Sequence, residues 1–236
     1  PWPVVIVGIA ILAWLGSRSW KLVAGTVIAF LVIGYFGMWK DTMATLAIIS
    51  VATLLCISFG IPLGIWMARS ERVQLAITPV LDVMQTIPSF VYLIPVVMLL
   101  GIGKVPGLIA VCIYAIPPLV RLTNLGIRLV DKEVLEAADA FGADNRQKLF
   151  GVQIPLALPT IMQGINQTTL MALAMVVIAS MIGTRGLGDE VLLGLQQLNV
   201  GKATEAGLAI VLLAIVLDRI TQAYGKKIQE RNQPPK

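Results

Sequence analysis

The sequence predicts an all-α integral membrane protein with about seven transmembrane helices, from its composition, its apolar segments and the spacing of its basic residues. Of its 236 residues, 57% are hydrophobic and 13% are charged, and the mean hydropathy is +0.86. Soluble domains carry about 45–50% apolar and about 25% charged residues. A chain of this size has no soluble core that could hold the surplus of apolar side chains, so lipid must surround much of its surface.

The apolar segments account for the predicted helices, since a helix needs about 20 apolar residues to cross a bilayer. They lie at roughly 3–16, 21–39, 43–67, 75–100, 105–122, 158–183 and 206–225. The first is short. The fourth contains Pro79, Pro88 and Pro95, which predicts kinks or a discontinuous helix.

The basic residues indicate the orientation. When the segments alternate in direction, all but four of the 18 Lys and Arg residues fall on one side. The four exceptions are Lys40, Lys104, Arg185 and Lys202. The basic-rich side is predicted to be cytoplasmic, which places Pro1 outside and Lys236 inside. The tryptophans fall near the predicted helix ends, as is typical of the membrane interface.

The sequence lacks the residues that several classes of function require. The chain has no histidine, the commonest general base and metal ligand, and no phosphate-binding G-x-x-x-x-G-K-[ST] loop. Cys56 and Cys112 lie in apolar segments and match no ligand spacing. The basic residues are dispersed between apolar segments, which argues against nucleic-acid binding. We therefore expect no catalytic residue, metal site or cofactor on this chain.

The connection at about 123–157 is predicted to hold two short cytoplasmic helices. The first would have an apolar face comprising Leu135, Ala138 and Phe141. Gly142 can end this helix in a left-handed conformation. The second would carry Arg146 and Lys148 and run to breaks at Pro155 and Pro159.

This connection resembles the "EAA" coupling loop of type I ABC importer permeases, whose pattern is E-A-A, three residues, G, nine residues, I-x-L-P. The corresponding residues are Glu136, Ala137, Ala138, Gly142, Val152, Ile154 and Pro155. Val152 and Ile154 replace the expected Ile and Leu. The resemblance implies that the loop, about 131–155, couples the membrane helices to an ATPase. The alternative is a solvated loop whose charges only fix the topology.

The resemblance extends over roughly 42–224 to the permeases of glycine betaine, proline betaine and choline importers. The resembling stretches are 60–66, 81–92, 166–168, 175–183 and 186–188, parts of which amino-acid permeases share. It implies a type I transmembrane domain at 42–224, two transmembrane helices outside that core at 1–41, and a cytoplasmic tail at 225–236.

The same resemblance implies partners and a location. The chain would be a multi-pass subunit of the bacterial cytoplasmic (inner) membrane, surrounded by lipid. It would work as a homodimer with two cytoplasmic ATPase subunits, which hold ATP and Mg, and with an external substrate-binding protein.

Polar residues within the apolar segments are candidates for a translocation path. Asp82 either faces that path or, as we favour, lies near the cytoplasmic interface, where it caps a kink or pairs with Arg69 or Arg72. Three more candidates share one helical face, where they could line the path or bond to another helix: Gln163, Asn166 and Gln167. Gln85 and Asn124 are weaker candidates.

Two further sets of residues could serve transport. Gly183, Gly186 and Gly188 lie in an external segment that could be a gate or a docking surface for the binding protein, or an ordinary loop. Aromatic side chains can hold a trimethylammonium group, and those available are Phe90, Tyr92 and Tyr114. Scattered aromatics in a membrane protein are more often packing residues.

The leading interpretation is thus an importer permease for a quaternary-ammonium osmoprotectant. A type I permease for another small solute, such as an amino acid, is the first alternative. An ion-coupled secondary transporter is weaker, because it would predict inverted repeats and paired intramembrane charges. A membrane enzyme is weaker still.

Overall fold

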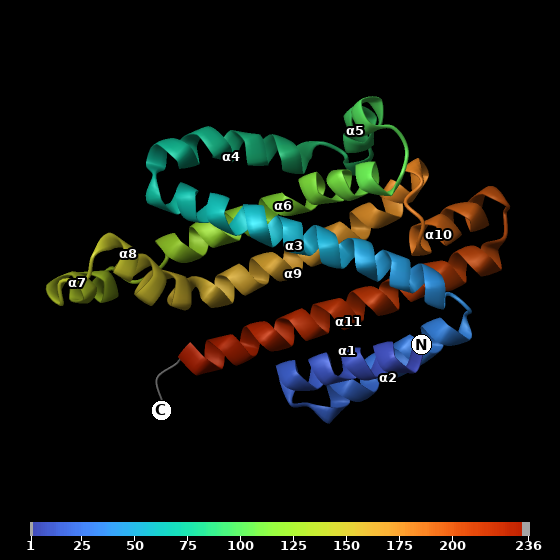
Figure 1. The fold of residues 1–236 in the computed structure, drawn as a ribbon, viewed down its shortest axis with the longest axis horizontal. Helices are drawn as coiled ribbons and strands as arrows, with labels where there is room; N and C mark the ends of the chain where they lie inside the picture. Colours follow the sequence, from blue (N-terminus) through green and yellow to red (C-terminus); the bar gives the residue numbers. More distant parts are fainter. Residues whose placement is uncertain (1, 233–236) are drawn as a thin grey trace.

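The computed structural model describes residues 2–232. Within this range all the regular secondary structure is helical, and short loops join the helices (Figure 1). The α-helices are α1 (Trp2–Ser17), α2 (Trp20–Tyr35), α3 (Trp39–Arg69), α4 (Glu71–Thr86), α5 (Leu93–Leu100), α6 (Lys104–Arg128), α7 (Lys132–Ala140), α8 (Asn145–Lys148), α9 (Ile154–Ala179), α10 (Leu187–Gln196) and α11 (Val200–Asn232). Shorter turns of other helical types are η1 (Ser89–Tyr92), η2 (Leu149–Gln153) and η3 (Ser180–Ile182).

Helices α3, α6 and α9 form the centre of the bundle, and α11 packs against α9. Glycines allow the central helices to approach closely. A Cβ on Gly164 would lie 3.2 Å from the Cα of Leu119, and one on Gly64 would lie 2.8 Å from the carbonyl oxygen of Val120. The α1–α2 hairpin lies on the outer side of α11 (Figure 1).

The fourth apolar segment is discontinuous, as predicted. The chain direction bends by 110° between helix α4 and the η1–α5 segment. The break falls at Ile87, which is extended (φ −67°, ψ 128°), because the residue before a proline is disfavoured in the helical conformation. Pro79 and Pro95 lie within α4 and α5, so Pro88 accounts for the break.

The predicted number of seven spans is not confirmed. Four helices of residues 2–232 are long and apolar enough to cross a membrane, or five segments if the bent pair counts as one span. Helices α1 and α2 have 16 residues each, or about 24 Å at 1.5 Å per residue, against a hydrocarbon core of about 30 Å. The segment expected at 21–39 ends earlier, at Tyr35, and Gly37 (φ +73°) turns the chain into α3.

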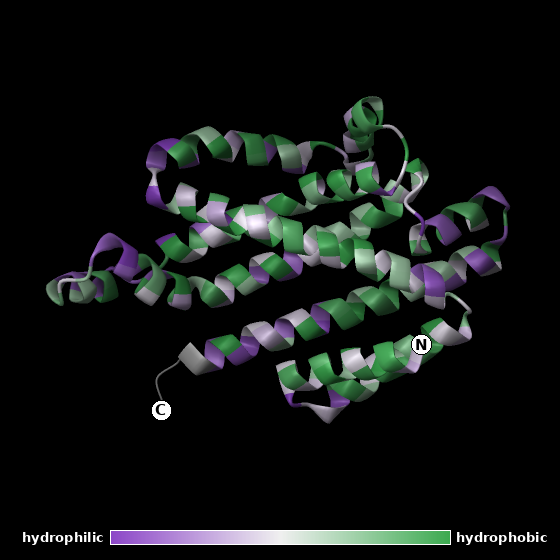
Figure 2. Cartoon of the chain, viewed as in Figure 1, coloured by the Kyte–Doolittle hydropathy of each residue, from purple (hydrophilic) through white to green (hydrophobic). Residues whose placement is uncertain are grey.

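Polar residues gather at the two ends of the bundle and apolar residues along its middle (Figure 2). The α3–α4 turn, the α7–α8 segment and the end of α11 lie at one end (Figure 1). The α1–α2 turn joins them there, because the Lys227 ammonium donates to the Leu15 carbonyl at 2.8 Å. Basic segments that are distant in the sequence therefore share one end, as the alternation of segments predicts.

Candidate functional site

The α7–α8 segment carries the first part of the coupling motif, and its turn is closed by backbone hydrogen bonds. The Asp131 carboxylate caps α7 by accepting from the Glu133 N–H at 3.0 Å. After α7, Gly142 is left-handed (φ +79°). Its N–H donates to the backbone carbonyl of Asp139 at 2.9 Å, and the N–H of Ala143 donates to the backbone carbonyl of Ala138 at 3.0 Å. This pattern is a Schellman motif, and it confirms the predicted role of Gly142 as the end of the helix.

The second short helix is also fixed by its own residues. Asp144 accepts from the N–H groups of Arg146 and Gln147, and the Gln147 side chain accepts from the Asp144 N–H at 2.9 Å. This reciprocal pair is a capping box. The Lys148 ammonium then bonds to the Asp139 carboxylate at 2.5 Å and joins α8 to α7. The loop is therefore a defined helix–turn–helix unit.

This unit projects beyond the end of the bundle (Figure 1). Glu136, Ala137 and Gly142 are exposed, and Ala138 is half-buried. The predicted apolar face is wrong at Phe141, which follows the last residue of α7 and is 93% exposed. Val134 and Phe150 are exposed as well. Apolar side chains displayed on a projecting unit are typical of a protein–protein contact.

The remaining motif residues lie where the loop enters the bundle. Val152, Ile154 and Pro155 are half-buried. The expected breaks at Pro155 and Pro159 are wrong, because the chain is helical from Asn145 to Ile182. The π-helical turn η2 widens the helix, and the Ile154 N–H therefore donates to the Leu149 carbonyl, five residues earlier. Pro155 then occupies the first turn of α9, where proline is tolerated.

Asp82 pairs with Arg121 of α6, and the predicted partners Arg69 and Arg72 are wrong. The ion pair joins α4 to α6, and its side chains are 56% and 37% exposed. Gln85, one turn further along α4, is exposed. Asn124 has a structural contact instead, since its side-chain oxygen accepts from the Arg128 guanidinium at 3.1 Å.

The candidates on α9 face α11 and not Asp82. The Asn166 amide donates to the Asp218 carboxylate at 2.8 Å, so Asn166 bonds across two helices. Gln163 and Gln167 are exposed and border a groove of about 600 Å³ between α9 and α11. Asp218 was not predicted as a site residue, although a carboxylate inside the segment 206–225 was a usable signal.

The glycines of the segment predicted to be external allow the α9–α10 connection to pack closely. Gly183 is left-handed (φ +87°), and a Cβ on Gly188 would lie 2.6 Å from the Cα of Val177. Leu187 is fully buried, and its N–H donates to the Thr45 hydroxyl of α3 at 2.9 Å. A Cβ on Gly186 would lie 2.5 Å from the same hydroxyl oxygen. These contacts fix α10 against α3.

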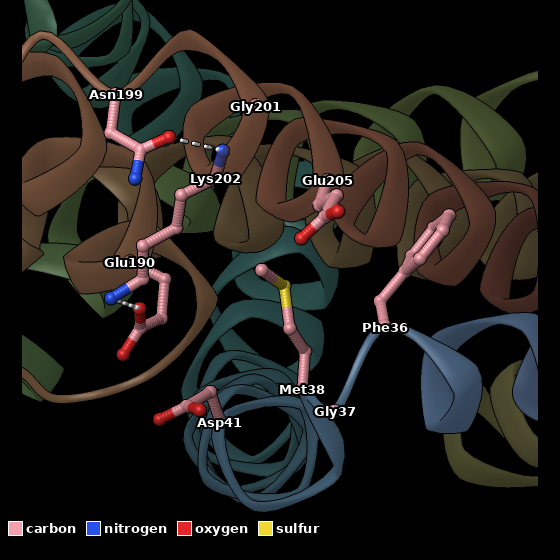
Figure 3. A pocket seen from close by; sticks show the side chains of 9 residues that line it. All are labelled: Phe36, Gly37, Met38, Asp41, Glu190, Asn199, Gly201, Lys202 and Glu205. Atoms are coloured by element: carbon pink, nitrogen blue, oxygen red, sulfur yellow. Dashed lines mark hydrogen bonds and ion pairs between the residues drawn. The ribbon is translucent and has the colours of Figure 1, made fainter.

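A polar pocket of about 530 Å³ lies beside α10, between the starts of α3 and α11 (Figure 3). Its carboxylates are those of Asp41, Glu190 and Glu205. The Lys202 ammonium pairs with Glu190 at 2.6 Å. This pocket was not predicted from the sequence, because its residues come from three separate segments.

The aromatic candidates do not form a cage. Tyr92 and Tyr114 pack edge to face with centroids 6.0 Å apart, and the Tyr92 hydroxyl donates to the Met84 carbonyl across the α4–η1 break. Phe90 is 58% exposed. Within residues 2–232, no three His, Cys, Asp or Glu side chains are placed to hold a metal ion.

Comparison with known proteins relates the chain to transport permeases. It is 53% identical over 98% of its length to the glycine betaine/proline betaine transport system permease protein ProW of Escherichia coli, and covers 65% of that relative. It is 48% identical over 96% of its length to the glycine betaine/carnitine transport permease protein GbuB of Listeria monocytogenes, and covers 81% of it. The chain thus spans slightly less than two thirds of the first relative.

The fold is that of a solved transporter. An inward-facing structure of the MetNI methionine ABC transporter matches with a TM-score of 0.69, at 20% identity, over 82% of this chain and 95% of the matched chain. A family model of the inner membrane components of binding-protein-dependent transport systems matches residues 60–230. The chain, which has a projecting α7–α8 unit between two long apolar helices, therefore belongs to this family of inner membrane transport components.

Proposed function

We propose that this chain is the permease subunit of an ATP-driven importer for glycine betaine or a related quaternary-ammonium solute such as proline betaine or choline. The observation that carries the proposal is the 53% identity to a glycine betaine/proline betaine permease across 98% of the chain. The projecting loop with the coupling motif supports the ATP-driven mechanism. The chain is a transport subunit, and ATP hydrolysis with Mg takes place on partner subunits.

The α7–α8 unit is the proposed docking site for the ATPase. Its exposed Val134 and Phe141 offer apolar contacts, while the exposed Glu133 and Glu136 set the register with a charged partner. The helix continues from α8 through η2 into α9 without a break. A displacement of the loop by the ATPase would therefore move α9, and alternating access would follow from that movement.

The rest of the assembly follows from the same proposal. Two copies of the permease enclose the path, with two ATPase subunits at the end that carries α7 and α8. That end and the C-terminal tail are cytoplasmic. An external binding protein delivers the solute at the opposite end, where Gly183, Gly186 and Gly188 hold the candidate gate in place. The candidate path residues are Asp82, Gln85, Gln163, Asn166 and Gln167.

Reconstitution tests the proposal. The chain is inserted into vesicles with its ATPase and binding protein, and uptake of glycine betaine and of methionine is measured with and without ATP. We expect ATP-dependent uptake of glycine betaine only. Uptake of methionine would favour the amino-acid alternative, and uptake driven by an ion gradient without ATP would favour a secondary transporter.

A further inference from the structure

A groove of about 700 Å³ separates the α1–α2 turn from the last third of α11. Four basic side chains border it, and the one acidic side chain at its edge is Glu230. The basic residues are Arg18, Arg219, Lys226 and Lys227. The coupling motif and the candidate path residues make no use of this concentration of positive charge.

These cations lack carboxylate partners. No ion pair involves any of the four among the residues that the structure describes. Lys227 donates to the Leu15 carbonyl at 2.8 Å, which leaves its charge uncompensated. Arg219 and Lys226 are two helical turns apart on one face of α11, and Arg18 approaches from the other wall. Four like charges around one groove repel one another, so an anion bound there would relieve the repulsion.

Close contacts between α1 and α11 form the wall of the groove, and this wall continues into an apolar surface. A Cβ on Gly16 would lie 2.9 Å from the Tyr224 ring, and the Tyr224 hydroxyl donates to the Leu12 carbonyl at 3.1 Å. Leu12 and Leu15 are 51% and 52% exposed on α1. Trp14 and Trp20 contact each other in a tilted arrangement with ring centroids 4.6 Å apart, and tryptophan is enriched at the membrane interface.

We propose that this groove binds the phosphate headgroup of an anionic phospholipid, whose acyl chains lie along the exposed leucines of α1. This proposal rests on the cytoplasmic placement of this end of the bundle under the proposed function, because a basic groove between helices at that surface suits such a headgroup. The excess of basic residues on cytoplasmic loops explains positive charge at this end of the bundle. It does not explain why cations from two distant segments converge on one groove beside an apolar wall.

Lipid binding to the purified full-length chain tests the proposal. Native mass spectrometry would measure bound dioleoyl phosphatidylglycerol, with dioleoyl phosphatidylcholine as the zwitterionic comparison. We expect Arg18→Gln with Arg219→Gln to weaken phosphatidylglycerol binding about 25-fold, at about fivefold for each charge removed. Phosphatidylcholine binding should not change. Each single variant should show about a fivefold loss, which keeps the test valid if the double variant is unstable.

The control is Arg69→Gln with Arg72→Gln, which removes the same charge from the exposed α3–α4 turn at the same end of the bundle. It should bind phosphatidylglycerol as the unmodified chain does. Equal losses in the two double variants, or no loss in the first, would overturn the proposal. Displacement of the lipid by an equal concentration of inorganic phosphate would assign the groove to free anions and would also overturn it.

Discussion

At Gly142 the backbone has φ +79°, which costs a residue with a Cβ about 1–2 kcal/mol. No atom lies within 4 Å of a Cβ built there, so the cost is in the backbone alone. Gly142→Ala should therefore weaken the turn and lower both glycine betaine uptake and substrate-stimulated ATPase activity. Gly142→Asn is the matched control, because Asn tolerates this conformation, and it should retain most of both activities. Equal losses in the two variants would mean that the turn conformation does not matter for coupling.

A second residue-scale test concerns Asn166 and Asp218. Hydrogen bonds between transmembrane helices contribute about 0.6 kcal/mol on average and up to about 1.7 kcal/mol. A double-mutant cycle with Asn166→Leu and Asp218→Leu should give a coupling energy in this range, measured by unfolding in detergent micelles. Gln163→Leu on the same face should be nearly neutral, since the exposed Gln163 makes no side-chain hydrogen bond within residues 2–232. A coupling energy of zero would leave Asn166 free to serve as a path residue.

At the scale of elements, the Asp82–Arg121 pair connects the bent α4–α5 segment to α6. If the pair positions α4, then Asp82→Asn should reduce uptake of choline and of glycine betaine alike, and Arg121→Gln should do the same. Exchanging the two residues, Asp82→Arg with Arg121→Asp, should restore part of the uptake. The measurement is vesicle uptake with the binding protein saturated. A selective loss of choline uptake in Asp82→Asn would instead make Asp82 the counter-charge of the cationic solute.

The elements that the sequence predicted well are those set by local chemistry. The break at Pro88, the end of α7 at Gly142 and the second helix at Arg146 all depend on residues within a few positions of one another. The partner of Asp82 depends on how α4 packs against α6, and it lies 39 positions away. The η2 turn was missed because proline was expected to end a helix, whereas a wider turn before Pro155 lets the helix continue. The pocket at Glu190 and Lys202 likewise depends on packing between distant segments.

At the scale of the whole molecule, the α7–α8 unit and the end of α11 lie at one end of the bundle (Figure 1), and the α1–α2 turn lies beside the last third of α11. The opposite end holds α10 and the start of α3. The length of α1 and α2 leaves open two arrangements, a hairpin that crosses the bilayer and one that lies in its surface. A crossing hairpin would add two spans to the five counted from α3 onward. The contact of Lys227 with Leu15 favours a turn at the same depth as the end of α11.

Labelling of single cysteines decides between these arrangements. In a background with Cys56→Ala and Cys112→Ala, one cysteine at a time would be placed at the exposed positions 21, 40, 145 and 197. Each variant would then be treated with a membrane-impermeant maleimide. We expect Lys21→Cys and Asn145→Cys to react only from the cytoplasmic side, because all but four of the 18 Lys and Arg residues are assigned to that side. Lys40→Cys and Gln197→Cys should react only from outside.

If the cysteine at 21 reacted from the same side as the one at 40, the hairpin would not cross and the count would be five spans. Reaction of 145 and 197 from one side would contradict the proposed orientation itself, because α9 alone separates the α7–α8 unit from α10.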